Sequence, residues 1–495
     1  MSTVRDGTTQ ATRYQNFIGG EWRPPASGQF FEDRSPAETS KVVALFPKSS
    51  ADDARAAVDA AAHASETWSR ELPPKRGAIL YKAADIIRSR LDAITRDFVL
   101  EDGKPIKEAR AEVLRAADIF EYFAGEGSRL GGDTLPSGRP GVFLYTLRRP
   151  LGVVAIITPW NFPVAIPAWK LAPALICGNT AVLKPASQAP LSLWHLVKAL
   201  EDAGLPAGVV NLVTGPGSIV GNALIEHPAV RGISFTGSTE IGTRVYQFGS
   251  QRTARVQCEM GGKNPLVVLA DANLDLAVRL ILEGAFSNAG QKCTATSRVI
   301  VERSVLDALT SRLVDATKAL AVGNPMDENT FVGPVIDEPA MTKILDYINI
   351  GRQEGAELLC GGRRLTERGL DQGYFIAPTV FGRVGPEMRI AQEEIFGPVV
   401  GLMAAADFDD AMRLANQTTF GLSAGIVTGS LEKAHAFSER IEAGLVMVNL
   451  PTAGVEYQAP FGGTKASGTA FKEQGQAALD FYTEVRTVAM RPSMT

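Results

Sequence analysis

The feature that most constrains this chain is an alternation of short apolar segments with helix-forming segments through its middle. The run Val153-Val154-Ala155-Ile156-Ile157 is apolar at every position, which is typical of a parallel-sheet strand covered on both faces. Further strands are expected at 180–183, 209–213, 232–235 and 255–259, with helices starting near Leu191, Ser218 and Ser238. This alternation predicts a right-handed, doubly wound α/β sheet.

A second α/β series follows from Pro265. Strands are expected at 266–269, 298–301 and around Val400, Gly425 and Val446, with helices at 274–288, 305–320 and 340–355. A chain of 495 residues also exceeds what one hydrophobic core usually supports. We therefore predict two α/β domains.

The segment before these series is predicted to be mainly helical. It opens with two strands around a Gly-Gly turn at 16–22. Ser49 or Ser50 with Asp52 or Asp53 offers a cap for a helix that runs to Trp68. Apolar residues at three- and four-residue steps over 79–91 predict an amphipathic helix that ends at 102–105, and a third helix is expected over 106–130.

Composition excludes several classes of function. The formal charge of -4 gives no reason to expect nucleic acid or an anionic membrane as a partner. No apolar run reaches the length of about 18 residues that a spanning helix needs. Residues 1–15 are polar and lack the apolar core of a secretory signal, so we expect a loose tail. Four cysteines without a CxxC pair favour a reduced, cytoplasmic protein over a disulfide framework or a zinc site.

Two stretches carry candidate chemistry. Cys293 lies among small and polar residues in Gly290-Gln291-Lys292-Cys293-Thr294-Ala295, and Glu259 stands between an apolar strand and Gly261-Gly262. Sites gather at strand ends of this kind. Taken alone, Cys293 could be a small core residue and Glu259 a helix cap or a surface charge.

Seven short motifs, taken together, are far more specific than any one of them. They are Pro159-Trp160-Asn161-Phe162-Pro163, Lys184-Pro185, Phe235-Thr236-Gly237-Ser238, Glu259-Met260-Gly261-Gly262-Lys263, Gly290-Gln291-Lys292-Cys293, Glu394-Ile395-Phe396-Gly397-Pro398 and Pro460-Phe461-Gly462-Gly463. In this order and spacing, the chain resembles the NAD(P)-dependent aldehyde dehydrogenases from about Phe17 to Val488.

The resemblance implies an aldehyde dehydrogenase-like α/β fold with three parts. A Rossmann-type dinucleotide-binding domain would comprise 1–130 and 151–262, and an α/β catalytic domain 263–475. A β arm from 131–150 and 476–495 would mediate the contacts of a homodimer or homotetramer.

The resemblance also assigns a mechanism. A free thiol is mostly protonated at neutral pH, and His63, His195, His227 and His435 stand in no motif, so a Cys-His hydrolase is the weaker hypothesis. In the family, Cys293 would attack the aldehyde, hydride transfer to the nicotinamide would leave a thioester, and Glu259 would activate the hydrolytic water. Asn161 and the Cys293 backbone N–H would stabilise the oxyanion. Taken alone, Asn161 could be a turn residue. Lys170 and Glu473 would relay protons to solvent, or they could form a surface ion pair.

Two glycine patterns compete for the cofactor. Gly215-Pro216-Gly217-Ser218-Ile219-Val220-Gly221 misses the dinucleotide fingerprint by one residue, whereas Gly237-Ser238-Thr239-Glu240-Ile241-Gly242 opens a helix whose N–H groups could meet a pyrophosphate. The resemblance favours the second, with Ser238 on a phosphate, Lys184 on the adenosine ribose, Glu394 on the nicotinamide ribose and Phe396 near the nicotinamide. The whole implied set is Ile157, Thr158, Pro159, Trp160, Lys184, Ser187, Gly217, Gly221, Phe235, Gly237, Ser238, Ile241, Met260, Gly261, Glu394 and Phe396.

Ser187 bears on cofactor choice. Relatives that prefer NAD often carry Glu at this position, where a carboxylate would repel the 2′-phosphate of NADP. A serine removes that repulsion, so NADP should be accepted beside NAD. No metal is implied.

The loop 452–460 and residues 166–170 resemble the 2,5-dioxopentanoate (α-ketoglutarate semialdehyde) dehydrogenase branch. Trp169 stands where succinate semialdehyde dehydrogenases often have Arg. Phe162, Trp169, Gln458 and Phe461 are the candidate substrate residues, although the aromatic ones could simply pack in the core. Succinate semialdehyde and an aromatic aldehyde stay open as substrates, and a catalytically silent binding protein is the non-enzyme alternative. Ala470 and Lys472 replace the usual Gly and Arg, which puts the proton relay in doubt.

Overall fold

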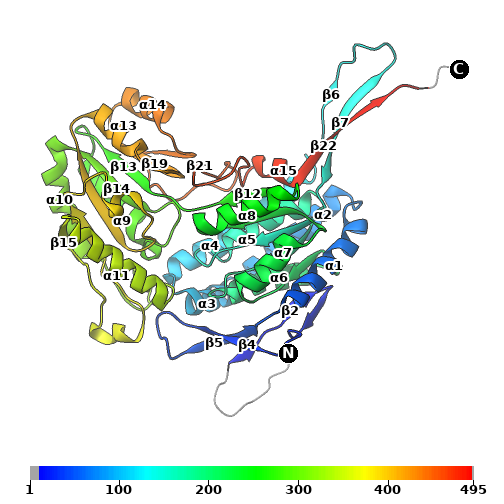
Figure 1. The fold of residues 1–495 in the computed structure, drawn as a ribbon, viewed down its shortest axis with the longest axis horizontal. Helices are drawn as coiled ribbons and strands as arrows, with labels where there is room; N and C mark the ends of the chain where they lie inside the picture. The colour runs from blue at the N-terminus through cyan, green and yellow to red at the C-terminus, as the bar shows by residue number, and fades with distance from the viewer. Residues whose placement is uncertain (1–10, 493–495) are drawn as a thin grey trace.

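The computed structural model describes residues 11–492, which form two seven-stranded sheets and a projecting ribbon (Figure 1). In the first sheet, five parallel strands are β8 (Val153–Ile157), β9 (Thr180–Lys184), β10 (Val210–Leu212), β11 (Val230–Thr236) and β12 (Arg255–Glu259). The antiparallel hairpin β2 (Asn16–Ile18) and β3 (Glu21–Arg23) completes the edge. All five parallel strands were predicted.

The strand order β12-β11-β8-β9-β10-β2-β3 contains a switch point at β8. The chain runs outward from β8 through β9 to β10, and then returns to the other side of β8 as β11 and β12. In doubly wound sheets, ligands bind in the crevice at the carboxyl ends of the strands at such a point. The loops after β8, β11 and β12 therefore begin where a ligand site is expected.

Helices cover both faces of this sheet (Figure 1). They are α1 (Ala51–Trp68), α2 (Pro73–Ser89), α3 (Leu91–Asp102), α4 (Ile106–Glu126), α5 (Ala165–Ile176), α6 (Pro190–Asp202), α7 (Asn222–Glu226) and α8 (Thr239–Gln251). Ser50 and Asp53 form the predicted capping box of α1. Two predictions were wrong in detail, because the helix expected up to residue 102 breaks at Arg90 and α4 ends at Glu126 instead of 130.

The prediction of a loose N-terminal tail is wrong for its described part. β1 (Thr12–Arg13) pairs in parallel with β5 (Val42–Pro47), which also pairs with β4 (Phe30–Arg34). The rest of that predicted tail, residues 1–10, lies outside the described residues.

The second sheet has the order β15-β16-β17-β14-β13-β19-β20. Its strands are β13 (Asn264–Val268), β14 (Thr296–Glu302), β15 (Glu357–Cys360), β16 (Thr379–Gly382), β17 (Val399–Ala405), β19 (Ser423–Val427) and β20 (Leu445–Val448). Its main helices are α9 (Leu274–Phe286), α10 (Arg303–Lys318), α11 (Glu338–Gln353), α13 (Phe408–Asn416) and α14 (Leu431–Arg440). Helix α9 stops two residues before its predicted end, where a turn leads into the segment that carries Cys293.

A three-stranded ribbon projects from the body of the molecule (Figure 1). It pairs β6 (Thr134–Leu135) and β22 (Thr483–Met490) with the two sides of β7 (Phe143–Pro150). Within residues 11–492, every helix is too short or too polar to cross a lipid bilayer.

Candidate active site

The candidate site lies where strand ends of the first sheet meet a loop of the second. The segments after β8 and β11 carry Asn161 and Gly237, and β12 ends at Glu259. The turn after α9 places Asn288 and Ala289 in the left-handed region and then leads to Cys293. Four segments that are far apart in sequence thus converge on one thiol.

Cys293 borders two cavities. A cavity of about 740 Å³ is bordered by Cys293 together with Phe162, Trp169 and Phe461. A second cavity, of about 240 Å³, is bordered by Cys293 together with Trp160, Ser238 and Glu394. A ligand in either cavity can therefore approach the same sulfur atom.

The backbone around Cys293 is fixed from β13. The Asn264 side chain donates to the Cys293 carbonyl and to the Ala295 carbonyl, both at 2.8 Å. A Cβ at Gly262 would lie 2.5 Å from the Cys293 carbonyl oxygen, so only glycine allows this approach. Burial, Glu394 and Glu259 raise the pKa of the Cys293 thiol to about 12.

Asn161 is buried in the loop after β8 and borders the smaller cavity with Cys293. Its side-chain Nδ2 donates to the Gln291 backbone carbonyl at 3.0 Å. Its backbone carbonyl accepts from the Lys104 ammonium at 2.7 Å. The amide has two N–H groups, so this bond leaves one for a second acceptor.

Glu259 is buried at the end of β12. Its Oε2 accepts a hydrogen bond from the Gly463 N–H at 3.4 Å, and among the described residues its Oε1 has no partner. Burial first, and then the Glu473 carboxylate, raises the pKa of Glu259 well above its ordinary value, whereas Lys170 and Lys472 oppose the shift. The carboxyl group is therefore held in its protonated form to a higher pH than an exposed glutamate.

Lys170 and Glu473 form a buried ion pair, so the alternative of a surface pair is wrong. The Trp169 indole N–H donates to the other oxygen of Glu473 at 2.6 Å, and Lys170 also donates to Ser234 at 2.9 Å. Trp169 thus binds Glu473 with its polar end and borders the larger cavity with its ring.

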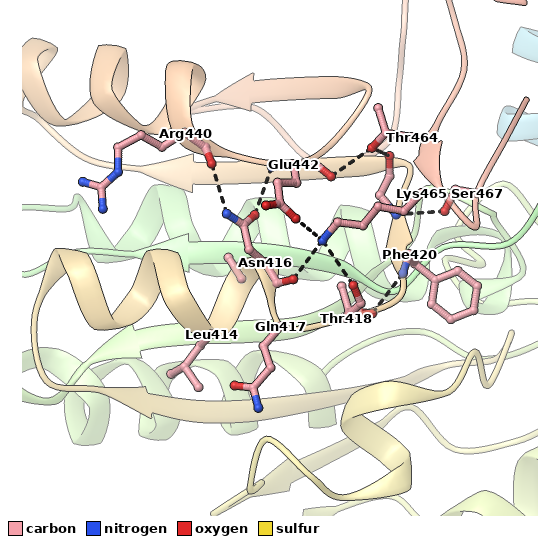
Figure 2. Close-up of polar contacts among 12 residues, drawn as sticks. Leu414, Asn416, Gln417, Thr418, Phe420, Arg440, Glu442, Thr464, Lys465 and Ser467 are labelled. Carbon is pink, nitrogen blue, oxygen red and sulfur yellow. Dashed lines mark hydrogen bonds and ion pairs between the residues drawn. The ribbon is translucent and has the colours of Figure 1, made fainter. Parts of the chain in front are cut away.

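The loop 462–468 contains Gly463, whose N–H binds Glu259. Antiparallel pairing of β18 (Phe420–Gly421) with β21 (Thr464–Lys465) holds this loop in place. Figure 2 shows Lys465, which donates to the carbonyls of Asn416 at 2.9 Å and Thr418 at 3.2 Å and pairs with Glu442. The Gly421 N–H donates to the Ser467 hydroxyl at 3.0 Å, and the Met260 N–H donates to the Ser467 carbonyl at 2.9 Å. These bonds set the loop beside Glu259.

The smaller cavity holds half of the predicted cofactor residues: Pro159, Trp160, Gly237, Ser238, Met260, Gly261, Glu394 and Phe396. Ser238 caps α8 and accepts from the Ile241 N–H at 3.4 Å. A Cβ at Gly237 would lie 2.5 Å from the ring of Phe235, and one at Gly261 would lie 2.4 Å from Glu394. Packing within the protein therefore requires glycine at both positions, beside the start of α8, where backbone N–H groups could meet a pyrophosphate.

Of the other eight predicted cofactor residues, Phe235 lies in β11 and Ile241 in the first turn of α8. The remaining six lie near the ends of β8 and β9. The Thr158 N–H donates to the Lys184 carbonyl at 3.1 Å, directly after Ile157. A Cβ at Gly217 would lie 3.9 Å from the Lys184 side chain, and one at Gly221 would lie 3.8 Å from it. Ser187 donates to the Gly215 carbonyl at 3.4 Å. Both competing glycine patterns thus reach the same edge of the sheet, and the residues present fit a dinucleotide.

Glu394 and Phe396, the residues predicted to lie near the nicotinamide, are both held by contacts within the protein. Glu394 accepts from the Gly262 N–H at 2.9 Å, and burial raises its pKa. Phe396 has a φ of 62° and meets Trp160 edge-on, with ring centroids 5.5 Å apart.

The larger cavity contains the four predicted substrate residues, since Gln458 borders it with Phe162, Trp169 and Phe461. Gln458 is exposed and donates to Glu456. Sequence reasoning missed Arg115, Lys292 and Tyr457, which also border the cavity. Arg115 lies inside the amphipathic pattern of α4, where an arginine is typical of a solvent-facing position. For Lys292, its place beside Cys293 in the motif is the signal that points to the site.

Fold and sequence together define the class: the chain belongs to the aldehyde dehydrogenase family, which it matches over residues 22–488. It is 45% identical over 484 residues to an alpha-ketoglutaric semialdehyde dehydrogenase of Bacillus subtilis, covering 98% of this chain and 99% of the relative. It is 44% identical over 465 residues to a 2,5-dioxopentanoate dehydrogenase of Saccharolobus solfataricus, covering 93% and 96%, respectively. The predicted family and branch are confirmed.

Solved structures give the same fold. A betaine aldehyde dehydrogenase from Staphylococcus aureus, solved in complex with NAD+, matches with a TM-score of 0.95 at 34% identity, over 97% of this chain and 96% of that one. A protein from Burkholderia cenocepacia described as a putative aldehyde dehydrogenase matches with a TM-score of 0.94 at 37% identity, over 97% of both chains. The chain is an NAD(P)-dependent oxidoreductase that converts an aldehyde to a carboxylic acid, as predicted.

Proposed function

We propose that this enzyme oxidises an unbranched semialdehyde that carries a carboxylate, with 2,5-dioxopentanoate as its substrate and Cys293 as its nucleophile. The observation that carries the catalytic part is the position of Cys293 at the border of both cavities. An aldehyde in the larger cavity and a nicotinamide in the smaller one would meet at the sulfur.

The roles of the other residues follow from their positions. Bound NAD(P) supplies the hydride acceptor. The thiol adds to the aldehyde carbon, and the developing oxyanion is stabilised by the free N–H of Asn161 and by the Cys293 N–H. Glu259 takes a proton from the water that hydrolyses the acyl-enzyme, and the buried Lys170–Glu473 pair passes that proton onward. The raised pKa of Glu259 supports this role, because a general base works best with a pKa near the working pH.

The substrate is supported by the names of the relatives and by the cavity. Two relatives at 45% and 44% identity are named for α-ketoglutaric semialdehyde, which is 2,5-dioxopentanoate. Trp169 offers no charge to a short substrate such as succinate semialdehyde, and its N–H is already bonded to Glu473. An aromatic aldehyde is the second candidate, because Phe162, Trp169 and Phe461 all border the cavity.

For the cofactor, we propose that NADP is accepted as well as NAD. Ser187, next to Lys184 and Gly217, presents a hydroxyl instead of a carboxylate, so a 2′-phosphate meets no negative charge from this position. The lowered pKa of Lys184, to about 8 through burial, leaves it largely cationic at neutral pH.

One screen tests both proposals. The reduced cofactor formed from 2,5-dioxopentanoate, succinate semialdehyde and benzaldehyde is measured with NAD and with NADP. We expect the highest kcat/KM for 2,5-dioxopentanoate and turnover with both cofactors. Preference for benzaldehyde would overturn the substrate, and no turnover with NADP would overturn the cofactor proposal.

We further propose the domain limits predicted above, with 131–150 and 476–495 as an oligomerisation arm, and a homodimeric or homotetrameric assembly. Pairing of β7 with β22 supports the arm. We place the enzyme in the cytoplasm, a setting consistent with the four free cysteines in the described chain.

A further inference from the structure

The substrate cavity contains a cationic side chain with unused hydrogen-bonding capacity. Arg115, on α4, borders the cavity that Cys293 also borders. Its Nη2 donates to the Val455 carbonyl and, at 3.3 Å, to Gln474. Within the described part of the chain, its Nε–H is buried and has no acceptor. A buried donor without an acceptor is unfavourable, so the guanidinium has hydrogen-bonding capacity that its contacts within the protein do not use.

The two other cations that border the cavity are already engaged. Lys104 pairs with Glu112 at 2.5 Å, donates to the Asn161 carbonyl and lies 4.0 Å from the ring centre of Phe162. Lys292 donates to the Glu283 carbonyl at 2.9 Å and to the Ser287 hydroxyl. Of these three cations, Arg115 therefore has the most capacity left for an anion.

Five carboxylates also border the cavity; two of them are paired with a cation and a third accepts a backbone hydrogen bond. Glu112 is neutralised by Lys104, and Asp118 pairs with Arg88 at 2.8 Å. Glu108 accepts from the Asn288 N–H at 3.1 Å. The remaining two, Glu283 and Glu456, are exposed, where water screens their charge.

We propose that Arg115 binds the carboxylate at the far end of the substrate and so selects aldehydes that end in a carboxylate or a 2-oxo-carboxylate. The inference rests on the proposed function, because it assigns the residue that recognises the substrate class. An arginine presents a planar fork of N–H donors that matches a carboxylate, and charge-assisted bonds of this kind are the strong ones. Cys293 holds the aldehyde end and Arg115 the anionic end. Val455 and Gln474 fix the guanidinium, which limits the entropy lost when it binds.

The test compares two substrates of equal chain length, 2,5-dioxopentanoate and pentanal. Arg115→Gln removes the charge and keeps an amide donor for the Val455 carbonyl. We expect kcat/KM for 2,5-dioxopentanoate to fall by at least about tenfold, mainly through KM, with pentanal changed by less than about threefold. Competitive inhibition by 2-oxoglutarate, the dicarboxylate product, should weaken by a similar factor. Arg115→Lys, which keeps the charge and loses the fork, should give an intermediate loss.

Arg110→Gln is the matched control, because Arg110 lies on the same helix, is exposed and pairs with Asp92 at 2.5 Å outside the cavity. Its two kcat/KM values should equal those of the wild type. If Arg115→Gln lowers kcat/KM equally for both substrates, Arg115 only supports the loop that carries Val455, and the inference is overturned. A wild-type preference for 2,5-dioxopentanoate that survives in Arg115→Gln and Arg115→Lys overturns the inference and leaves the proposed function standing. A wild type without that preference overturns the proposed substrate class, and the inference with it.

Discussion

Burial and the Glu394 and Glu259 carboxylates raise the pKa of the Cys293 thiol, the proposed nucleophile, to about 12. Only a small fraction is thiolate at neutral pH, and the thiolate is the nucleophile. A cation beside the sulfur would lower this pKa, and the oxidised nicotinamide ring carries such a charge. The thiol would therefore stay protonated and unreactive until the oxidised cofactor binds and lowers its pKa.

Replacement of the nucleophile separates chemistry from binding. Cys293→Ala should abolish aldehyde oxidation while the affinity for the cofactor stays within about threefold of wild type, because most of the cofactor residues belong to the first sheet. Isothermal titration with each cofactor and a steady-state assay measure the two effects. Full activity in this variant would exclude Cys293 as the nucleophile.

Glu259→Gln should make acyl-enzyme hydrolysis slower than its formation. Rapid mixing should then show a burst of reduced cofactor followed by a slow steady state, and mass spectrometry should detect the acylated protein. In the wild type, kcat should rise with pH up to the raised pKa of Glu259, because only the ionised carboxylate accepts a proton. This acidic limb should be absent from Glu259→Gln. A variant with neither a burst nor an acyl adduct would show that Glu259 acts before the thioester forms.

In the proposed cofactor site, residue 187 determines whether a negative charge lies beside the adenosine ribose. Ser187→Glu would place a carboxylate beside the 2′-phosphate of NADP, and two like charges about 4 Å apart repel by roughly 4 kcal/mol at an effective dielectric of 20. Even a third of that approaches tenfold in affinity. We expect the NADP-over-NAD ratio of kcat/KM to fall by at least about tenfold, with Ser187→Ala as the control that adds no charge. An unchanged ratio would mean that residue 187 does not face the ribose.

At the scale of elements, a buried ion pair holds the start of α5 against α4. Glu112 on α4 accepts from the Val164 and Ala165 N–H groups, each at 3.0 Å, and pairs with Lys104. The same Lys104 donates to the Asn161 carbonyl. The loop that carries the predicted oxyanion donor is thus connected to α4 through two buried charges.

Glu112→Gln should therefore be costly. The amide cannot neutralise Lys104, and breaking a buried pair typically costs about 3–5 kcal/mol. The midpoint of urea unfolding should fall clearly, and kcat should fall with it because Asn161 loses its support. Glu121→Gln on the same helix is the control, since its pair with Arg88 is largely exposed and should contribute about 1 kcal/mol or less. Equal losses in both variants would contradict this role of the buried pair.

Helix α5 was not predicted from the sequence. Every residue of α5 is buried, so no amphipathic period exists to predict it, and Pro167 and Pro173 argue against a helix. The strands of the first sheet were predicted because short apolar segments alternate there with helix-forming segments, whereas the edge strand β15 and its neighbour β16 were missed. The break at Arg90 lies within a continuous apolar period, so nothing in the pattern revealed it.

In the candidate site, too, some features could be predicted from the sequence and others could not. Cys293, Glu259 and Asn161 were predicted from their motifs, and the structure brings the segments that carry them together. The burial of the Lys170–Glu473 pair could not be predicted, because it depends on Trp169 and Ser234 from separate elements. Arg115 was missed for a related reason, since its contacts are to Val455 and Gln474, more than 300 residues away.

At the scale of the whole molecule, the ribbon that projects from the body (Figure 1) carries exposed apolar side chains. The register pairs Phe143 with Met490 and Tyr145 with Val488, and side chains paired in this way lie on the same face of the ribbon. Phe143 is 53% exposed and Met490 is 49% exposed. This face is the surface that a second subunit would cover in the proposed oligomer.

A charge placed on this face should dissociate the proposed oligomer. Burying a side chain of this size stabilises by about 1.5–3 kcal/mol, and a two-fold interface contains it twice. Phe143→Asp should thus weaken association by at least about a hundredfold. Sedimentation velocity over a concentration series should show the wild type as a dimer or tetramer and the variant as a smaller species. Thr487→Asp adds the same charge to the opposite face of the ribbon, because Thr487 pairs with Thr146, and it should leave the assembly unchanged. A wild type that sediments as a monomer, or equal dissociation in both variants, would exclude this face as the interface.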